Sequence, residues 1–230
     1  MGLRPVFLTG LLILTSITVI SAAEENISGR LVITRSLTKQ RVVLPTYQDR
    51  GVTTHLHQEV ANRSINEWER VVVYLEGDRA PRATPITATM TQRGEHFDPE
   101  LLVVPSGSTV SFPNADPIFH NVFSLSKVRE FDLGFYPAGE TRSVKFEKPG
   151  IVQVFCHLHP EMSASILVVP NGWFVRPSNQ GTFSFSAIPA GNYQVVAWHR
   201  SAGFFRKQIQ VPQSGIVKVS MEIPIGANEP

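Results

Sequence analysis

One heptapeptide, residues 156–162, combines three side chains that bind soft transition metals. Cys156, His159 and Met162 stand at Cys-x-x-His-x-x-Met spacing, directly after the strand-like run at 151–155. A thiolate, two imidazoles and a weakly bound thioether form the ligand set in which copper cycles between its two oxidation states. The spacing therefore predicts that this loop supplies three of four copper ligands. The fourth would be an imidazole from another part of the chain.

The only cysteine gains meaning from the expected destination of the protein. Residues 1–23 read as a secretory signal peptide, with Arg4 in the charged region, an apolar stretch at 6–20 and small residues at 21–23. A membrane anchor is the alternative, but the apolar stretch is short for a span. We therefore expect a soluble exported protein, for example periplasmic, without stable membrane insertion after signal removal. In an oxidising compartment a lone cysteine has no disulfide partner in its own chain, so a metal is a fitting partner for its thiolate.

Each of these side chains also has an ordinary structural explanation. Cys156 alone would be a small buried hydrophobe, and Met162 alone would fill the core. A hydrolase with a cysteine nucleophile and a histidine base is chemically possible, but it gives the methionine no role. The joint spacing therefore favours the metal site.

The other histidines do not extend this site. His55 and His57 form a His-x-His pair within the charged stretch 37–69, and a pair lacks the three or four ligands of a protein metal site. His96 is expected in a loop and His199 at the end of a strand, and the sequence identifies no partner for either.

Composition bounds the function further. The net charge is +2 with both signs scattered along the chain, so neither nucleic-acid binding nor a polybasic membrane patch is indicated. Residues 86–170 contain 6 Lys+Arg and 9 Asp+Glu, a net charge of −3, which leaves +5 for the flanks. This acidic part can contribute to the docking of a redox partner.

Short alternating or apolar runs, separated by turns rich in proline, glycine and asparagine, are typical of an all-β chain built as sandwiches. Apolar residues make up 42% of the chain, enough for one large or two small cores. A short helix is expected only at 60–69, and 37–69 as a whole departs from the strand pattern. The expected strands are 29–34, 70–75, 101–104, 109–112, 142–146, 152–155, 164–169, 182–185, 193–198, 206–211 and 216–222.

From about residue 97 to 170 the chain resembles the cupredoxins, the blue-copper family that includes plastocyanin, pseudoazurin and amicyanin. The resemblance rests on a Val-Pro-x-Gly strand entry at 104–107, on Asn114, on His-Asn-Val at 120–122 and on the heptapeptide. It implies a Greek-key β-sandwich, which we place at 86–170.

The resemblance also implies a ligand set for one mononuclear type 1 copper. Its members are the equatorial ligands His120, Cys156 and His159 and the axial ligand Met162. Asn121 matches the position whose side chain ties the two ligand loops together by hydrogen bonds. His157 departs from the family pattern, but a neighbour of the cysteine in extended backbone should point away from the metal, so we leave it outside the set.

In the family, electrons enter and leave through the exposed edge of the second histidine, here His159, with Pro160, Phe119 and Ile118 as the docking surface. The expected function is therefore electron transfer between unidentified redox proteins, without catalysis. A copper oxidase or nitrite reductase needs further copper centres and more than the seven histidines present. A copper carrier, or a partner-binding module without redox turnover, stays open as the alternative.

A second resemblance covers residues 181–222. Gly-x-Phe-x-Phe followed by Pro-x-Gly-x-Tyr-x-Val is similar to the carboxypeptidase regulatory-like, transthyretin-like sandwich. That fold places two strands before the Gly-x-Phe strand, and runs of this type stand upstream of the cupredoxin-like part. We therefore expect a split sandwich, 27–77 with 173–224, into which the copper domain is inserted. Two domains in tandem with an N-terminal arm are the alternative.

Overall fold

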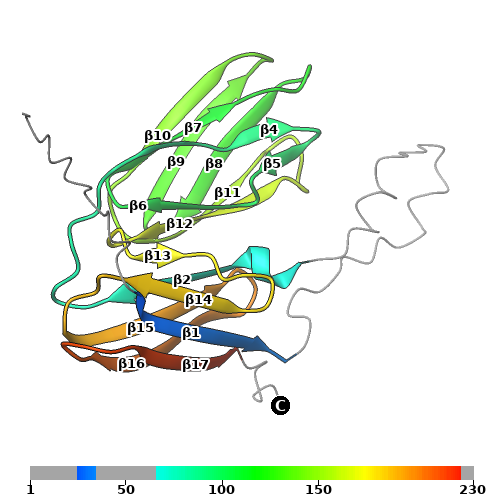
Figure 1. Ribbon diagram of the computed structural model, residues 1–230. Helices are drawn as coiled ribbons and strands as arrows, with labels where there is room; N and C mark the ends of the chain where they lie inside the picture. The colour runs from blue at the N-terminus through cyan, green and yellow to red at the C-terminus, as the bar shows by residue number, and fades with distance from the viewer. Residues whose placement is uncertain (1–24, 35–65, 224–230) are drawn as a thin grey trace, which may run out of the picture.

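The computed structural model describes residues 25–34 and 66–223, which form strands and one short 3-10 helix (Figure 1). The all-β prediction is confirmed. The expected signal peptide, most of the stretch 37–69, and both His55 and His57 lie outside the described residues. In chain order, the elements are β1 (Glu25–Ile33), η2 (Glu67–Arg70), β2 (Val71–Glu76), β3 (Thr87–Thr89), β4 (Thr91–Arg93), β5 (His96–Asp98), β6 (Leu101–Pro105), β7 (Ser108–Pro113), β8 (His120–Ser126), β9 (Arg129–Tyr136), β10 (Thr141–Phe146), β11 (Gly150–Phe155), β12 (Ser163–Val169), β13 (Phe174–Val175), β14 (Thr182–Ser186), β15 (Gly191–His199), β16 (Gly203–Val211) and β17 (Val217–Ile223).

Two sheets form the half of the molecule that contains the heptapeptide. One has the strand order β10-β7-β3 and the other β6-β12-β11-β8-β9, with the β4–β5 hairpin beside them. Their facing side chains alternate along the strands, as in Val110 and Phe112 of β7 or Val152 and Val154 of β11, and they form one continuous core. Each strand thus turns every second residue inward, which is the expected geometry of a sandwich.

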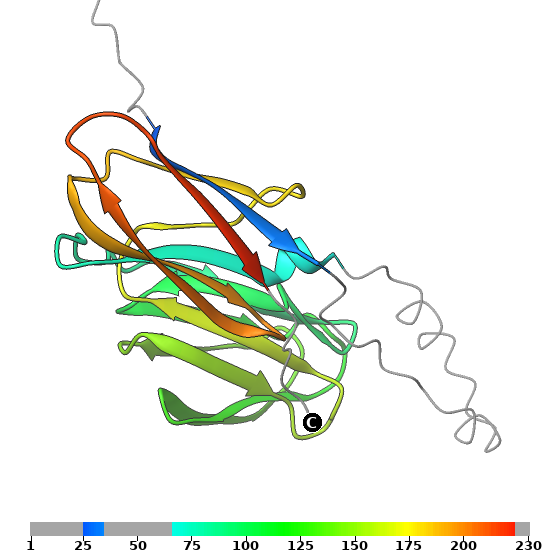
Figure 2. The same cartoon turned by 90° about the horizontal axis from the view of Figure 1, so that it is seen from below.

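The other two sheets combine strands from both ends of the described chain. The order is β14-β1-β17 in one sheet and β13-β2-β15-β16 in the other. β1 runs parallel to β17 and antiparallel to β14, and β2 runs antiparallel to β15. Strands that precede residue 86 therefore pair with strands that follow residue 170, and Figure 2 shows β1 beside β17. The domain limits themselves, and the transthyretin-like relationship, stay predictions.

Each pair of sheets encloses its own apolar core, and a third apolar layer joins the two pairs. β2 and β15 face β6 and β12 through a cluster centred on Trp198, Leu167 and Val169. These strands are buried on both faces, which explains their nearly continuous apolar sequences, such as Val71-Val-Val-Tyr-Leu75. The four sheets are therefore stacked with three apolar layers between them (Figure 1).

Arg200 adds polar contacts to this junction. Its Nε donates to Ser165 Oγ at 3.1 Å, its Nη2 donates to the carbonyl of Ser163 at 3.2 Å, and its Nη1 donates to Glu100 at 2.7 Å. Ser163 is the first residue of β12, the strand that follows the heptapeptide. Arg200, which follows β15, thus holds the start of β12, where the expected copper loop ends.

All of the expected strands are present. The sequence pattern did not predict β8 and β9, nor the short strands β3, β4, β5 and β13. His120 is the first residue of β8, and His96, which was expected in a loop, is the first residue of β5. The short helix expected at 60–69 is a 3-10 helix at Glu67–Arg70, whose Trp68 N–H is accepted by the Asn66 side chain at 3.1 Å. Across the described ranges, no helix has the length and apolar character that crossing a membrane requires.

Candidate metal centre

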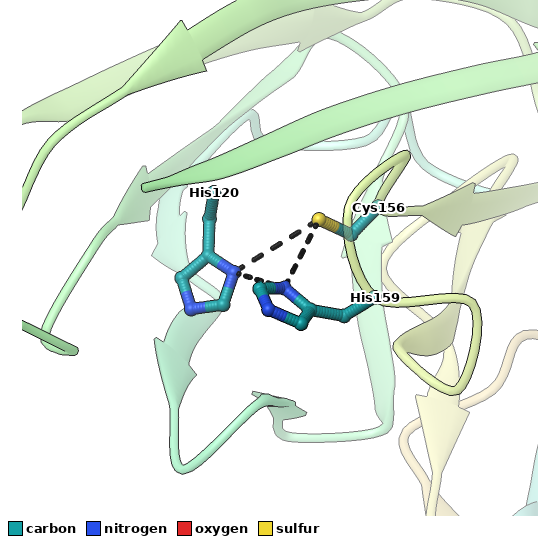
Figure 3. Close-up of side chains that lie close together, drawn as sticks. All are labelled: His120, Cys156 and His159. Atoms are coloured by element: carbon teal, nitrogen blue, oxygen red, sulfur yellow. Dashed lines mark hydrogen bonds between the residues drawn. The ribbon is translucent and has the colours of Figure 1, made fainter. Parts of the chain in front are cut away.

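Three predicted ligands converge at one end of the first sandwich. His120 opens β8, and Cys156 and His159 lie in the loop after β11 (Figure 3). Cys156 Sγ is 3.9 Å from His120 Nδ1 and 3.8 Å from His159 Nδ1, and the two Nδ1 atoms are 3.0 Å apart. Within the described residues, this is the one group of three such side chains close enough to hold a metal ion.

Strand parity decides which loop side chains point inward. Cys156 continues the inward-facing series of Val152 and Val154 and is buried with them in the core. His157 continues the opposite series, which faces away from that core. Because side chains alternate along extended backbone, the cysteine sulfur reaches the two histidines and the neighbouring imidazole does not.

The surroundings of His157 fit this placement. Its ring stacks on Phe123, with centroids 3.8 Å apart and planes 4° from parallel. Its Nε2 lies 3.5 Å from Asp132 Oδ2, and this carboxylate also accepts from the Gly134 N–H at 2.8 Å and from the Asn121 amide at 2.7 Å. The His157 imidazole therefore has its own partners on the outer face of the sheet.

A buried carboxylate contacts the far side of the first histidine. His120 Nε2 is 2.8 Å from Asp116 Oδ2, and the two backbone N–H groups of Gly94 and Glu95 donate to the same carboxylate at 2.6 and 2.9 Å. Burial by itself would raise the pKa of Asp116, but these hydrogen bonds lower that pKa below its ordinary value. Asp116 Oδ2 thus lies beside one ring nitrogen of His120, Nε2, while the other ring nitrogen, Nδ1, faces Cys156 Sγ at 3.9 Å.

The turn between β4 and β5 reaches both histidines. Gly94 and Glu95 both have positive φ, 60° and 59°, as a two-residue hairpin requires. This backbone geometry turns the two N–H groups towards Asp116. The Glu95 side chain lies with its Oε2 3.9 Å from His159 Nε2 at the molecular surface. One tight turn is therefore linked to His120 through Asp116 and to His159 directly.

Asn114 orders the segment that presents Asp116. Its Oδ1 accepts from the Asp116 N–H at 3.0 Å, and its Nδ2 donates to the carbonyls of Ile118 at 2.8 Å and Tyr136 at 3.2 Å. Tyr136 is also the strand partner of His120 across β8 and β9. The buried asparagine thus fixes the chain on both sides of the first histidine.

The structure places the two remaining predicted residues less directly. Met162 is buried in the core cluster that contains Cys156, and its N–H donates to the His159 carbonyl at 2.9 Å, closing the loop into a turn. The Asn121 Nδ2 donates to Asp132 on β9, while its buried Oδ1 has no hydrogen-bond partner among the residues that the structure describes. The axial role of Met162 and the loop-linking role of Asn121 stay predictions.

The donor set fits a copper ion. Two imidazole nitrogens and one thiol sulfur lie within 3.0 to 3.9 Å of one another, and the second nitrogen of His120 faces Asp116 instead. Such a set of borderline and soft donors suits copper better than magnesium or calcium, which prefer oxygen ligands.

The two apolar side chains that precede His120 in the sequence are exposed. Phe119 is 56% exposed and Ile118 is 41% exposed, although both are large hydrophobic residues. The His159 side chain is 22% exposed, and Pro160 beside it is exposed. The residues named from the sequence as a docking surface are thus accessible to a partner.

Sequence reasoning missed Asp116 and Glu95. Asp116 stands four residues before His120, in the Asn-Ala-Asp-Pro segment at 114–117, and a carboxylate so close to an expected histidine ligand was an available signal. Glu95 offered no such signal, because its proximity to His159 depends on a hairpin that the sequence pattern did not reveal. His199 likewise has a partner that was not foreseen, the Glu67 carboxylate at 2.9 Å.

No protein-family model matches the chain, and no curated protein matches it by sequence. Solved structures similar to part of it include a purple cupredoxin from Nitrosopumilus maritimus, at 22% identity and a TM-score of 0.34, over 36% of this chain and 99% of that protein. An amicyanin variant in its Cu(I) form is 17% identical with a TM-score of 0.35, over 42% of this chain and 98% of the other. A copper-containing nitrite reductase from Thermus scotoductus SA-01 is 27% identical with a TM-score of 0.35, over 41% of this chain and 25% of the enzyme. Each of these similarities spans less than half of the chain.

Proposed function

We propose that this protein binds one mononuclear type 1 copper ion and carries single electrons between redox proteins, without catalysing a reaction itself. The observation that carries the proposal is the convergence of His120 Nδ1, His159 Nδ1 and Cys156 Sγ within 3.0 to 3.9 Å of one another. These three side chains would be the equatorial ligands and Met162 the axial one.

A copper ion held by one thiolate and two imidazoles exchanges one electron with little change in geometry. The chain supplies the rest of what such a carrier needs. The Asp116 carboxylate contacts His120, burial keeps water from Cys156, and His159 is partly exposed, as are the apolar side chains Phe119 and Ile118. A reduced partner docked there would give its electron through the His159 ring, and an oxidised partner would take it by the same route.

The proposal extends to the organisation and destination of the chain. We place the copper domain at 86–170, inserted into a transthyretin-like sandwich made of 27–77 and 173–224. The pairing of β1 with β17 and of β2 with β15 supports this division. The signal-peptide pattern at 1–23 supports export to the periplasm or an equivalent compartment.

Redox cycling tests electron transfer against copper delivery. Copper-loaded protein is reduced and reoxidised in the presence of a Cu(I) chelator, while visible absorption and bound copper are followed. An electron carrier is expected to keep about one copper per chain and to recover its absorption in each cycle. Transfer of Cu(I) to the chelator on reduction would overturn the proposal in favour of a copper carrier. Cys156→Ser is the control, because it keeps both histidines and removes the thiolate.

A further inference from the structure

The contact between Asp116 and His120 is unlike the other polar contacts of the site. Asp116 is 7% exposed, and its carboxylate is the partner of the one His120 nitrogen that does not face Cys156. The 94–95 turn donates two backbone hydrogen bonds to this carboxylate, and Asn114 accepts from its backbone N–H. The 94–95 turn and His120 thus hold the side chain of Asp116, and Asn114 holds its backbone.

We propose that Asp116 is a positioning residue that sets the tautomer of His120 and favours Cu(II) over Cu(I) at the centre. The proposal rests on the copper function argued above. A carboxylate that accepts from Nε2–H keeps the proton on that nitrogen, so Nδ1 is ready to bind a metal. It also increases the electron density on the imidazole, which strengthens the bond to the more highly charged ion.

The two histidines differ in their contacts with carboxylates. The Nε2 of His120 is buried and 2.8 Å from a carboxylate oxygen, whereas that of His159 is 3.9 Å from the half-exposed Glu95 carboxylate. Only the first distance is a hydrogen bond. Water screens the second contact, so the buried carboxylate should dominate the electrostatic effect on the copper.

Asp116→Asn is the informative substitution, because an amide oxygen in place of Oδ2 retains an acceptor for His120 and for the Glu95 N–H while the charge is removed. The amide nitrogen replaces Oδ1, so the hydrogen bond from the Gly94 N–H is also lost. We expect the Cu(II) dissociation constant to rise about 10- to 100-fold. Because the affinity for Cu(I) should fall less than the affinity for Cu(II), the ratio of the two should change about tenfold in favour of Cu(I). The reduction potential should then rise by about 59 mV, the value for a one-electron couple. Glu130→Gln is the matched control, since it neutralises an exposed carboxylate on β9, the strand that pairs with the strand of His120. If Asp116→Asn changes the potential no more than this control does, the proposal is wrong.

The tautomer is measured without copper, in the unsubstituted protein. Long-range proton–nitrogen NMR of the metal-free chain should show His120 with its proton on Nε2 and a bare Nδ1 at neutral pH. A proton on Nδ1 would overturn the proposal, whatever the copper experiments show. Failure of the copper function is recognised separately, because it would remove the visible absorption of the Cu(II) protein while this NMR signature persisted.

Discussion

Replacing Trp198 by alanine removes the largest side chain of the apolar layer that joins the two halves of the molecule. Trp198 is 1% exposed and packs with Leu101, Leu167 and Val169 from the opposing sheet. A buried aromatic side chain covers about 150–250 Å², which at about 25 cal/mol per Å² corresponds to about 4–6 kcal/mol. Measured substitutions of this kind cost about 3–5 kcal/mol, so both routes give a similar loss in the free energy of unfolding.

The assay is urea unfolding followed by circular dichroism, supported by calorimetry. For a chain of this size, a loss of about 3–5 kcal/mol lowers Tm by about 6–20 °C. Leu125→Ala is the control, because Leu125 is a large apolar side chain on β8 that is 73% exposed and lies outside this layer. A loss below about 1 kcal/mol for Trp198→Ala, which is close to the effect of a surface substitution, would refute the idea that this layer joins the halves.

Three further substitutions test other parts of the fold and site. Gly29→Ala should lower the free energy of unfolding by about 1–3 kcal/mol in urea titrations, because a Cβ there would lie 2.0 Å from the Phe183 ring. An unchanged midpoint would contradict the packing of β1 on β14. Burial lowers the pKa of His199 below 6.5 despite the Glu67 carboxylate, so the unfolded chain binds more protons and stability should fall as pH drops through 6.5 towards the lowered value. His199→Gln should lack that part of the slope in unfolding midpoints between about pH 8 and about pH 5. Met162→Leu keeps the side-chain volume, so it should cost less than about 1.5 kcal/mol in stability. It removes the sulfur donor, so the reduction potential of the copper should rise. An unchanged potential would remove Met162 from the ligand set.

Periodicity was sufficient for the sheets that bury one face or both. β7 and β11 alternate cleanly, and the two-sided burial of β2 and β12 shows in their apolar runs. β8 was missed because it opens with the polar pair His120-Asn121, which is buried at the site. A strand that carries buried polar side chains does not show the alternation of an ordinary sheet.

The heptapeptide and His120 could be predicted as candidate ligand positions because ligand types and spacing are local properties of the sequence. The groups that hold them could not. The contact of Asp116 with the 94–95 turn joins segments about 20 residues apart, and it depends on two positive φ angles and on the burial of Asn114. Such contacts depend on tertiary packing, which no short pattern records.

The most direct test of the central claim is a titration of the metal-free protein with Cu(II), followed by visible absorption. We predict an intense thiolate-to-copper band that saturates at about one copper per chain and is absent in Cys156→Ser. A weakly absorbing complex, or a band that survives this substitution, would contradict a centre built on Cys156, His120 and His159.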